Sequence, residues 1–155
     1  MDNVFIDYLK DYVDEKIDIE EVELFLSKNP KFIDKYFKPV DIPLYRGVCL
    51  LNEAELENEI GKLKSYSSNK SIACSFASSY RIDKSFTSLI LLCKEGICLD
   101  VNDIIKDNVY SKEKEYLVFS ITSKIVKKLS KEKTDLEDIL SLDYFKNIIK
   151  ELREF

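Results

Sequence analysis

The chain has 155 residues, the size of one ordinary domain, and 45% of them are hydrophobic, which is enough to form a core. Lys and Arg number 24 against 29 Asp and Glu, and this net charge of -5, with both signs scattered along the chain, disfavours a nucleic-acid binder. There is no histidine, which excludes Ser-His-Asp and Cys-His nucleophile systems and His-containing zinc or iron sites. Any chemistry must come from carboxylates, hydroxyls, Lys or Arg.

The first residues carry no basic segment followed by an apolar stretch, and no apolar run approaches the roughly 18 residues of a membrane span. We therefore expect a soluble protein of the cytoplasm. Cys49, Cys74, Cys93 and Cys98 lack CxxC spacing and sit among apolar residues, so we interpret them as buried free thiols. Without a histidine cluster or a carboxylate cage, we expect no bound metal.

Helices are predicted for the beginning of the chain. Apolar residues recur at helical spacing over 4–13 and again over 19–26. A further helical turn over 32–37 leads to Pro39 and Pro43, which should end the helical part.

Short strands and helices are predicted to follow the prolines. The pattern indicates a strand over 44–51, a Glu-rich helix over 53–63 and an extended piece over 65–67. Residues 72–77 then carry apolar side chains on one helical face.

The second half of the chain begins with an apolar run over 88–93 that has the length of a buried strand. Gly96 is expected to make a turn into a strand over 97–101. The segment 113–119, Glu-Lys-Glu followed by Tyr-Leu-Val-Phe, is predicted as a further strand, and 121–129 as one more.

Helices first, strands in the middle and a last helix, with apolar spacing over 136–152, predict an α+β domain rather than a doubly wound parallel sheet. We expect a single domain over 1–155, with N-terminal helices over 1–43, a sheet core over 44–129 and a C-terminal helix over 134–155. No GxGxxG or P-loop is present, so a Rossmann or ATPase interpretation has no support.

Five polar residues are candidates for chemistry. Glu113 and Glu115 are two apart at the start of a predicted strand, so both carboxylates should project from the same face. Taken alone, such a pair is more typical of a solvated strand end. Ser65 and Ser67 also share a face, and Arg46 in an apolar strand needs an anionic partner.

These five residues belong to three motifs that follow one another along the chain. In their order, the motifs resemble those of the bacterial and phage ADP-ribosyltransferases of the R-S-E class. These enzymes are arginine-specific mono-ADP-ribosyltransferases with an ExE motif. The resemblance covers roughly residues 44 to 120. The motifs are Leu44-Tyr45-Arg46-Gly47, then Ser65-Tyr66-Ser67 followed by Ile72-Ala73-Cys74-Ser75-Phe76-Ala77, and then Glu113-Lys114-Glu115 running into Tyr116-Leu117-Val118-Phe119.

The resemblance implies two small, roughly perpendicular β-sheets flanked by helices, with NAD in the cleft between the sheets. It implies an enzyme that cleaves NAD, releases nicotinamide and transfers ADP-ribose to an arginine of a target protein. NAD would be a substrate and no metal would be needed. By analogy, the protein would be a phage or bacterial effector acting in the cytoplasm of the producing or infected cell, with neither a membrane nor a nucleic acid as partner.

The resemblance also implies roles for the cofactor-binding residues. Arg46, next to Gly47, would hold the NAD phosphates and ribose, because its fork of donors suits bidentate recognition of oxygen. Ser65 would position the catalytic glutamate and Ser67 would support the loop. Tyr66 stands where many members have Thr, as is familiar in phage-type members.

The glutamates would divide the reaction between them. Glu115 would be catalytic, bonded to the 2′-hydroxyl of the nicotinamide ribose, and Glu113 would orient and deprotonate the acceptor arginine. Tyr110 matches the aromatic residue that recognises the protein substrate, or packs at the rim. Arg81 would touch the NAD phosphates, or is a plain surface arginine.

Two alternatives stay open at this point. One is an NAD glycohydrolase, in which water replaces arginine with the same Glu-x-Glu machinery. The other is a catalytically silent protein-binding module with the same fold. The histidine-dependent ADP-ribosyltransferases and the related RNA 2′-phosphotransferases are disfavoured by the absence of histidine.

Overall fold

The structure is a computed structural model that describes residues 2–50, 53–78 and 87–129. The C-terminal helix predicted over 134–155 and Arg81 lie outside the described residues.

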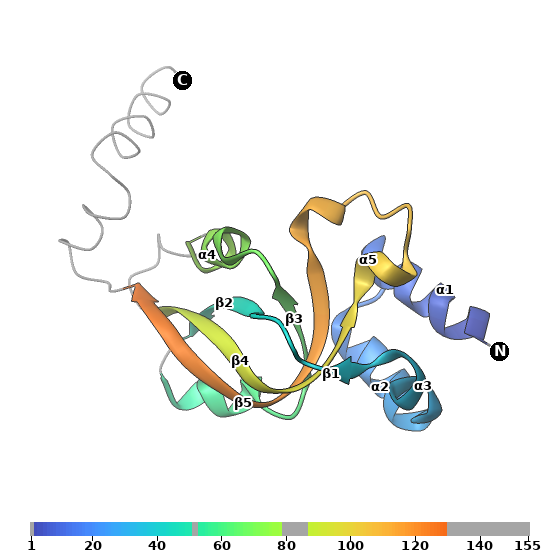
Figure 1. Ribbon diagram of the computed structural model, residues 1–155, viewed down its shortest axis with the longest axis horizontal. Coiled ribbons are helices and arrows are strands. Elements are labelled where there is room, and N and C mark those ends of the chain that lie inside the picture. Colours follow the sequence, from blue (N-terminus) through green and yellow to red (C-terminus); the bar gives the residue numbers. More distant parts are fainter. Residues whose placement is uncertain (1, 51–52, 79–86, 130–155) are drawn as a thin grey trace, which may run out of the picture.

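Three helices open the domain and pack together at one end of it (Figure 1): α1 (Asp2–Val13), α2 (Ile19–Lys28) and α3 (Lys31–Tyr36). They confirm the helices predicted from the apolar spacing. The Asp18 carboxylate caps α2 by accepting a hydrogen bond of 3.0 Å from the backbone N–H of Glu21. The apolar faces meet in one core, in which Phe5, Leu9, Val22 and Leu26 are completely buried.

The strands form one antiparallel five-stranded sheet in the order β1-β4-β2-β3-β5, and an additional pairing of β4 with β5 closes it into a small barrel-like shape. The α+β class is therefore confirmed. The hydrogen bonds join all the described strands into one sheet rather than the two that the resemblance implied. The strands are β1 (Lys38–Pro39), β2 (Tyr45–Leu50), β3 (Leu63–Ser67), β4 (Thr87–Asp100) and β5 (Glu115–Leu129).

The long strands β4 and β5 each cover a region in which the sequence predicted two shorter strands. The turn predicted at Gly96 is wrong, because β4 continues through it with local irregularities in its pairing to β5. A Cβ atom at Gly96 would lie 2.4 Å from the carbonyl oxygen of Phe119, so the glycine is needed for close approach of the two backbones. Residues 121–129 likewise belong to β5.

The pairing changes along these two curved strands (Figure 1). The first half of β4 pairs with β2 and with the end of β5, whereas its second half pairs with β1 and with the beginning of β5. The beginning of β5 also pairs with β3. Each long strand thus takes part in two differently composed portions of the sheet, which bend relative to each other.

The remaining helices are short. The helix predicted over 53–63 is a 3₁₀ helix, η1 (Glu53–Glu59), and it ends early because the buried Leu63 already begins β3. The helix predicted around 72–77 is confirmed as α4 (Lys70–Ser78), and α5 (Val101–Ile104) and η2 (Ser111–Glu113) precede β5. None of the helices in the described ranges has the length and apolar character needed to cross a membrane.

The four cysteines are free thiols, as predicted, although Cys93 and Cys98 are buried and Cys49 and Cys74 only partly so. Burial raises the pKa of the Cys98 thiol to about 11, with further contributions from Asp41 and from other nearby groups. These features fit side chains that pack rather than react.

Candidate functional site

A cleft with two adjoining lobes, of about 510 and 680 Å³, opens beside β2 and β3. One lobe follows β2 and the other lies against the turn between α1 and α2. Both volumes fall within the roughly 300–1,000 Å³ usual for ligand pockets. The two lobes adjoin, because they share five lining residues: Arg46, Ser65, Phe76, Glu113 and Glu115.

Glu115 lies at the centre of this cleft, as the first residue of β5. Its Oε2 atom accepts hydrogen bonds of 2.5 Å from the Tyr12 hydroxyl and from the Ser65 hydroxyl. Ser65 comes from the paired strand β3, whereas Tyr12 comes from α1. The structure thus brings together the Ser65 and Glu115 that the sequence singled out.

Glu113 lies outside β5, and the prediction that it shares a strand face with Glu115 is wrong. It ends η2, and the following Lys114 has a left-handed backbone with φ 47°, which breaks the period of two. Glu113 nevertheless lines both lobes of the cleft. Burial raises the pKa of Glu113, and the charges of Glu115 and Glu15 add to the effect. The pair is therefore a juxtaposition of two like charges.

Ser67 holds the turn that presents Glu113. Its hydroxyl donates a 2.7 Å hydrogen bond to the backbone carbonyl oxygen of Glu113 and accepts one of 3.0 Å from the backbone N–H of Asn69. This contact fits the supporting role that the resemblance implied for Ser67. It ties the end of β3 to the segment that precedes β5.

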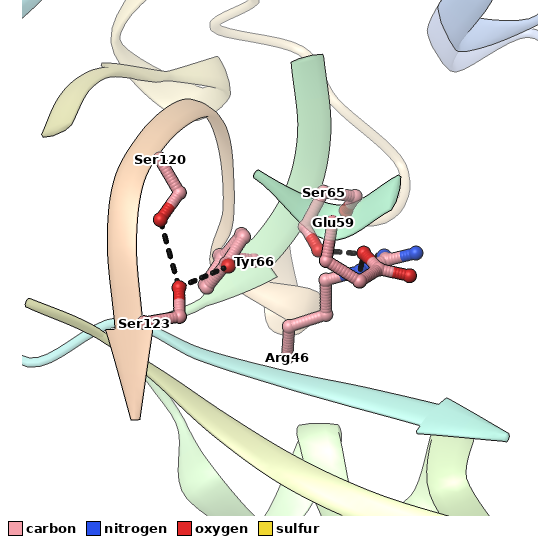
Figure 2. A network of polar contacts seen from close by, with 6 residues as sticks. All are labelled: Arg46, Glu59, Ser65, Tyr66, Ser120 and Ser123. Carbon is pink, nitrogen blue, oxygen red and sulfur yellow. Dashed lines mark hydrogen bonds and ion pairs between the residues drawn. The ribbon is translucent and has the colours of Figure 1, made fainter. Parts of the chain in front are cut away.

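Arg46 finds the anionic partner that its place in a strand demanded. Its Nε donates to Glu59 Oε2 at 2.7 Å and its Nη1 donates to the backbone carbonyl oxygen of Ser65 at 3.1 Å (Figure 2). The Glu59 side chain is only 7% exposed, so the ion pair is well shielded. These two hydrogen bonds use only part of the five N–H groups of the guanidinium, and Arg46 lines both lobes of the cleft.

Tyr66, expected among the cofactor contacts, is one of the residues that line the first lobe, but its side chain is buried in the core. Its side chain is 2% exposed and packs in the core with Leu44 and Val118. Its hydroxyl lies 3.1 Å from the Ser123 hydroxyl, which lies 2.7 Å from that of Ser120 (Figure 2). The alternation of side chains along β3 explains this, since the residue between two cleft-facing serines must face the core.

Gly47 lies in the cleft wall, but the packing of α4 accounts for it. A Cβ atom at this position would lie 1.9 Å from the carbonyl oxygen of Ala73 and 2.7 Å from the backbone nitrogen of Ala77. Only glycine allows α4 to rest on β2 at this distance. Tyr110, by contrast, is 44% exposed and lines the second lobe, where it is available to a partner.

The second lobe has an acidic character. Six carboxylates line it against three cationic side chains. The carboxylates are those of Glu15, Asp18, Glu20, Glu21, Glu113 and Glu115, and the cations are Lys16, Arg46 and Lys64. No group of three or more potential ligands among the described residues is arranged to hold a metal ion.

Tyr12, Glu59 and Phe76 are residues of the cleft that the sequence did not assign to a site. Tyr12 falls within the helix predicted over 4–13, and 103 positions separate it from Glu115, so no local pattern could join them. Phe76 belongs to the motif over 72–77, but the helical spacing does not indicate that its side chain is 50% exposed in the cleft.

Comparison with protein family models, with curated proteins and with solved structures found no match to this chain.

Proposed function

We propose that the protein is a mono-ADP-ribosyltransferase, which cleaves NAD and transfers ADP-ribose to an arginine of a target protein. The observation that carries the proposal is the carboxylate of Glu115, held in an open cleft by the Ser65 hydroxyl and flanked by Arg46 and Glu113. The same residues belong to the motifs that carry the resemblance to the R-S-E class.

Glu115 supplies the charge that such a reaction needs. When the bond between ribose and nicotinamide breaks, its electron pair leaves with neutral nicotinamide and positive charge develops on the ribosyl carbon. A fixed carboxylate beside that carbon stabilises the charge, as in glycoside hydrolysis. Because Ser65 and Tyr12 occupy Oε2, the Oε1 atom is the one that would accept a hydrogen bond from the 2′-hydroxyl.

Arg46 is the candidate for binding the NAD phosphates. Glu59 and the carbonyl oxygen of Ser65 fix the orientation of the guanidinium, and Arg46 lines both lobes of the cleft. The pairing with Glu59 also neutralises much of its charge, so Arg46 would act through directed hydrogen bonds more than through long-range attraction. Phe76, half exposed in both lobes, offers an apolar surface for a planar ring.

Glu113 and the acidic second lobe suit a cationic acceptor. A guanidinium is attracted by a concentration of carboxylates and repelled by a basic surface. The raised pKa of Glu113 makes it a better proton acceptor than an ordinary glutamate, which favours loss of a proton from arginine as the new bond to ribose forms. Water in place of the guanidinium would give NAD hydrolysis with the same residues.

The bend of the sheet supports an ADP-ribosyltransferase fold. In that fold NAD lies between two small sheets, and here β4 and β5 divide their pairing between two portions of one sheet with the cleft beside them. The end of α1, the beginning of α2 and the turn between them line the second lobe, in agreement with a helical flank.

The test is incubation of the purified full chain with NAD and a bacterial lysate, with Glu115→Gln as the matched control. We expect release of nicotinamide, measured by chromatography, and arginine-linked ADP-ribose on lysate proteins, measured by mass spectrometry. Nicotinamide release without any modified protein would favour the glycohydrolase. Neither product, from a folded protein, would overturn the proposal.

A further inference from the structure

Tyr12 reaches the cleft from outside the sheet that carries the other candidate residues. Its hydroxyl donates a hydrogen bond of 2.5 Å to Glu115 Oε2, the atom that also accepts from Ser65. The two donors approach from different elements, α1 and β3. One oxygen of the carboxylate is therefore held between two hydroxyl groups.

The packing of α1 fixes the place of this phenol. Leu9 and Val13, on either side of Tyr12 along the helix, are 0% and 8% exposed in the core that α1 shares with α2 and α3. Tyr12 also packs against this core. Because the helix is anchored in the core and the Tyr12 ring packs against it, the hydroxyl is held in place beside Glu115.

The phenol remains a donor at neutral pH. Burial raises the pKa of Tyr12 far above its ordinary value, and the charge of Glu115 and the hydrogen bond to it act in the same direction. Ionisation of the phenol would place two negative charges side by side in the cleft. Because the hydroxyl keeps its proton, the contact is a charge-assisted hydrogen bond with a carboxylate as acceptor.

We infer that Tyr12 is a positioning residue for Glu115, and that it fixes the carboxylate so that Oε1 faces the reacting ribose. This inference rests on the proposed function, and it gives the N-terminal helices a part in the site. Two donors on one oxygen define the plane of the carboxylate, whereas Ser65 alone would allow it to rotate about its terminal bond. A misoriented carboxylate would still meet NAD, but it would stabilise the transition state less well.

The test compares Tyr12→Phe with Tyr8→Phe in the full chain. Tyr8 stands one helical turn earlier, where its ring lies 4.2 Å from that of Phe25, and it does not reach the cleft. Both substitutions remove one hydroxyl and keep the ring, so both variants should fold. For Tyr12→Phe we expect kcat for nicotinamide release to fall by about tenfold to thirtyfold while KM for NAD stays within about twofold. Tyr8→Phe should leave both constants unchanged.

A spectroscopic measurement tests the contact without any activity. In protein labelled with ¹³C at the Cζ of tyrosine, the resonance missing from Tyr12→Phe belongs to Tyr12. We expect this resonance to shift in Glu115→Gln, because the Tyr12 hydroxyl then loses its charged acceptor. The other tyrosine resonances serve as internal controls.

The outcomes separate the inference from the proposed function. An unchanged kcat in Tyr12→Phe, or a raised KM with normal kcat, would overturn the positioning role although the enzyme is active. A Tyr12 resonance at the same position in wild type and Glu115→Gln would overturn the contact itself. A wild-type protein that shows the contact but releases no nicotinamide would overturn the proposed function, and with it the role of Tyr12 in that reaction.

Discussion

The two faces of β3 carry similar hydroxyl groups in opposite settings. On one face, Tyr66 lies in the core with Ser120 and Ser123 of β5, and the three hydroxyls bond to one another. On the other face, Ser65 and Ser67 bond to Glu115 and to the backbone of Glu113 beside an open cleft (Figure 2 includes Ser65). The core group is neutral, and the cleft group surrounds charges.

The difference indicates which group serves structure and which serves chemistry. Neutral hydroxyls can be buried when they form hydrogen bonds with one another, because no polar atom is then left without a partner. Glu113 and Glu115, in contrast, raise each other's electrostatic energy in a partly buried place, which a protein without a use for them would avoid. Substitutions on the cleft face should therefore change activity, and those on the core face should change stability.

Glu115→Gln should have the largest effect. The amide keeps the shape of the side chain but removes the charge opposite the developing ribosyl cation, so nicotinamide release and arginine modification should both fall by about two to three orders of magnitude. Initial rates of both products check this, with the melting temperature as a control for folding. Wild-type rates in this variant would exclude the cleft as the active site.

Glu113→Gln should separate the two activities. Glu115 remains intact, so slow release of nicotinamide should continue, while transfer to arginine should fall about hundredfold for want of a group to hold and deprotonate the guanidinium. Parallel assays of free and arginine-linked ADP-ribose measure the ratio. Equal loss of both products would contradict the division of labour between the glutamates.

The stability of Glu113→Gln provides the control. Because the folded state raises the pKa of Glu113, the folded protein holds a proton between the ordinary pKa and the raised one that the unfolded chain has released. This group's contribution to stability therefore falls as pH rises through that window. The variant should melt no lower than wild type at neutral pH, and its advantage should shrink on acidification.

Arg46→Lys should have a smaller effect, on binding. Lysine can still neutralise Glu59, but a point charge cannot bond to Glu59, to the carbonyl oxygen of Ser65 and to a phosphate at once. We expect NAD to bind about tenfold more weakly in calorimetry, consistent with the loss of one charge-assisted hydrogen bond. An unchanged affinity would remove Arg46 from the phosphate site.

Tyr66→Phe should have the smallest effect, and it should spare activity. The substitution removes a hydroxyl whose partner Ser123 still has Ser120, so it should cost about 1 kcal/mol and lower the melting temperature by roughly 2–4 °C. The rate of nicotinamide release should stay at the wild-type value. A loss of activity larger than the loss of stability would mean that the two faces of β3 are coupled.

The sequence predicted the elements whose patterns are local. Apolar spacing found the N-terminal helices and α4, and the strand pattern found β2 and β3. The prediction of a turn at Gly96 was wrong, because the sequence does not distinguish a glycine needed for close contact with Phe119 from a glycine needed for a turn. The prediction that Glu113 and Glu115 share a strand face was wrong, because nothing in the sequence indicates that Lys114 has a left-handed backbone.

Within the site, Arg46, Ser65 and Glu115 could be predicted because they stand within motifs. Glu59 and Tyr12 could not, since each acts through a partner that is distant in the chain. Glu59 stands in a Glu-rich segment where no single carboxylate is distinctive. The pairing of β3 with β5 brings Ser65 beside Glu115, and the packing of α1 brings Tyr12 to the cleft.

The contact of α4 with Gly47 has a consequence for how the cleft responds to its surroundings. The wall that carries Phe76 is set by two backbones pressed together, a steric contact that dissolved ions cannot weaken. The exposed carboxylates of the second lobe are different, because salt at physiological strength screens charges over about 8 Å. Rising ionic strength should therefore weaken capture of a cationic acceptor while leaving the shape of the cleft intact.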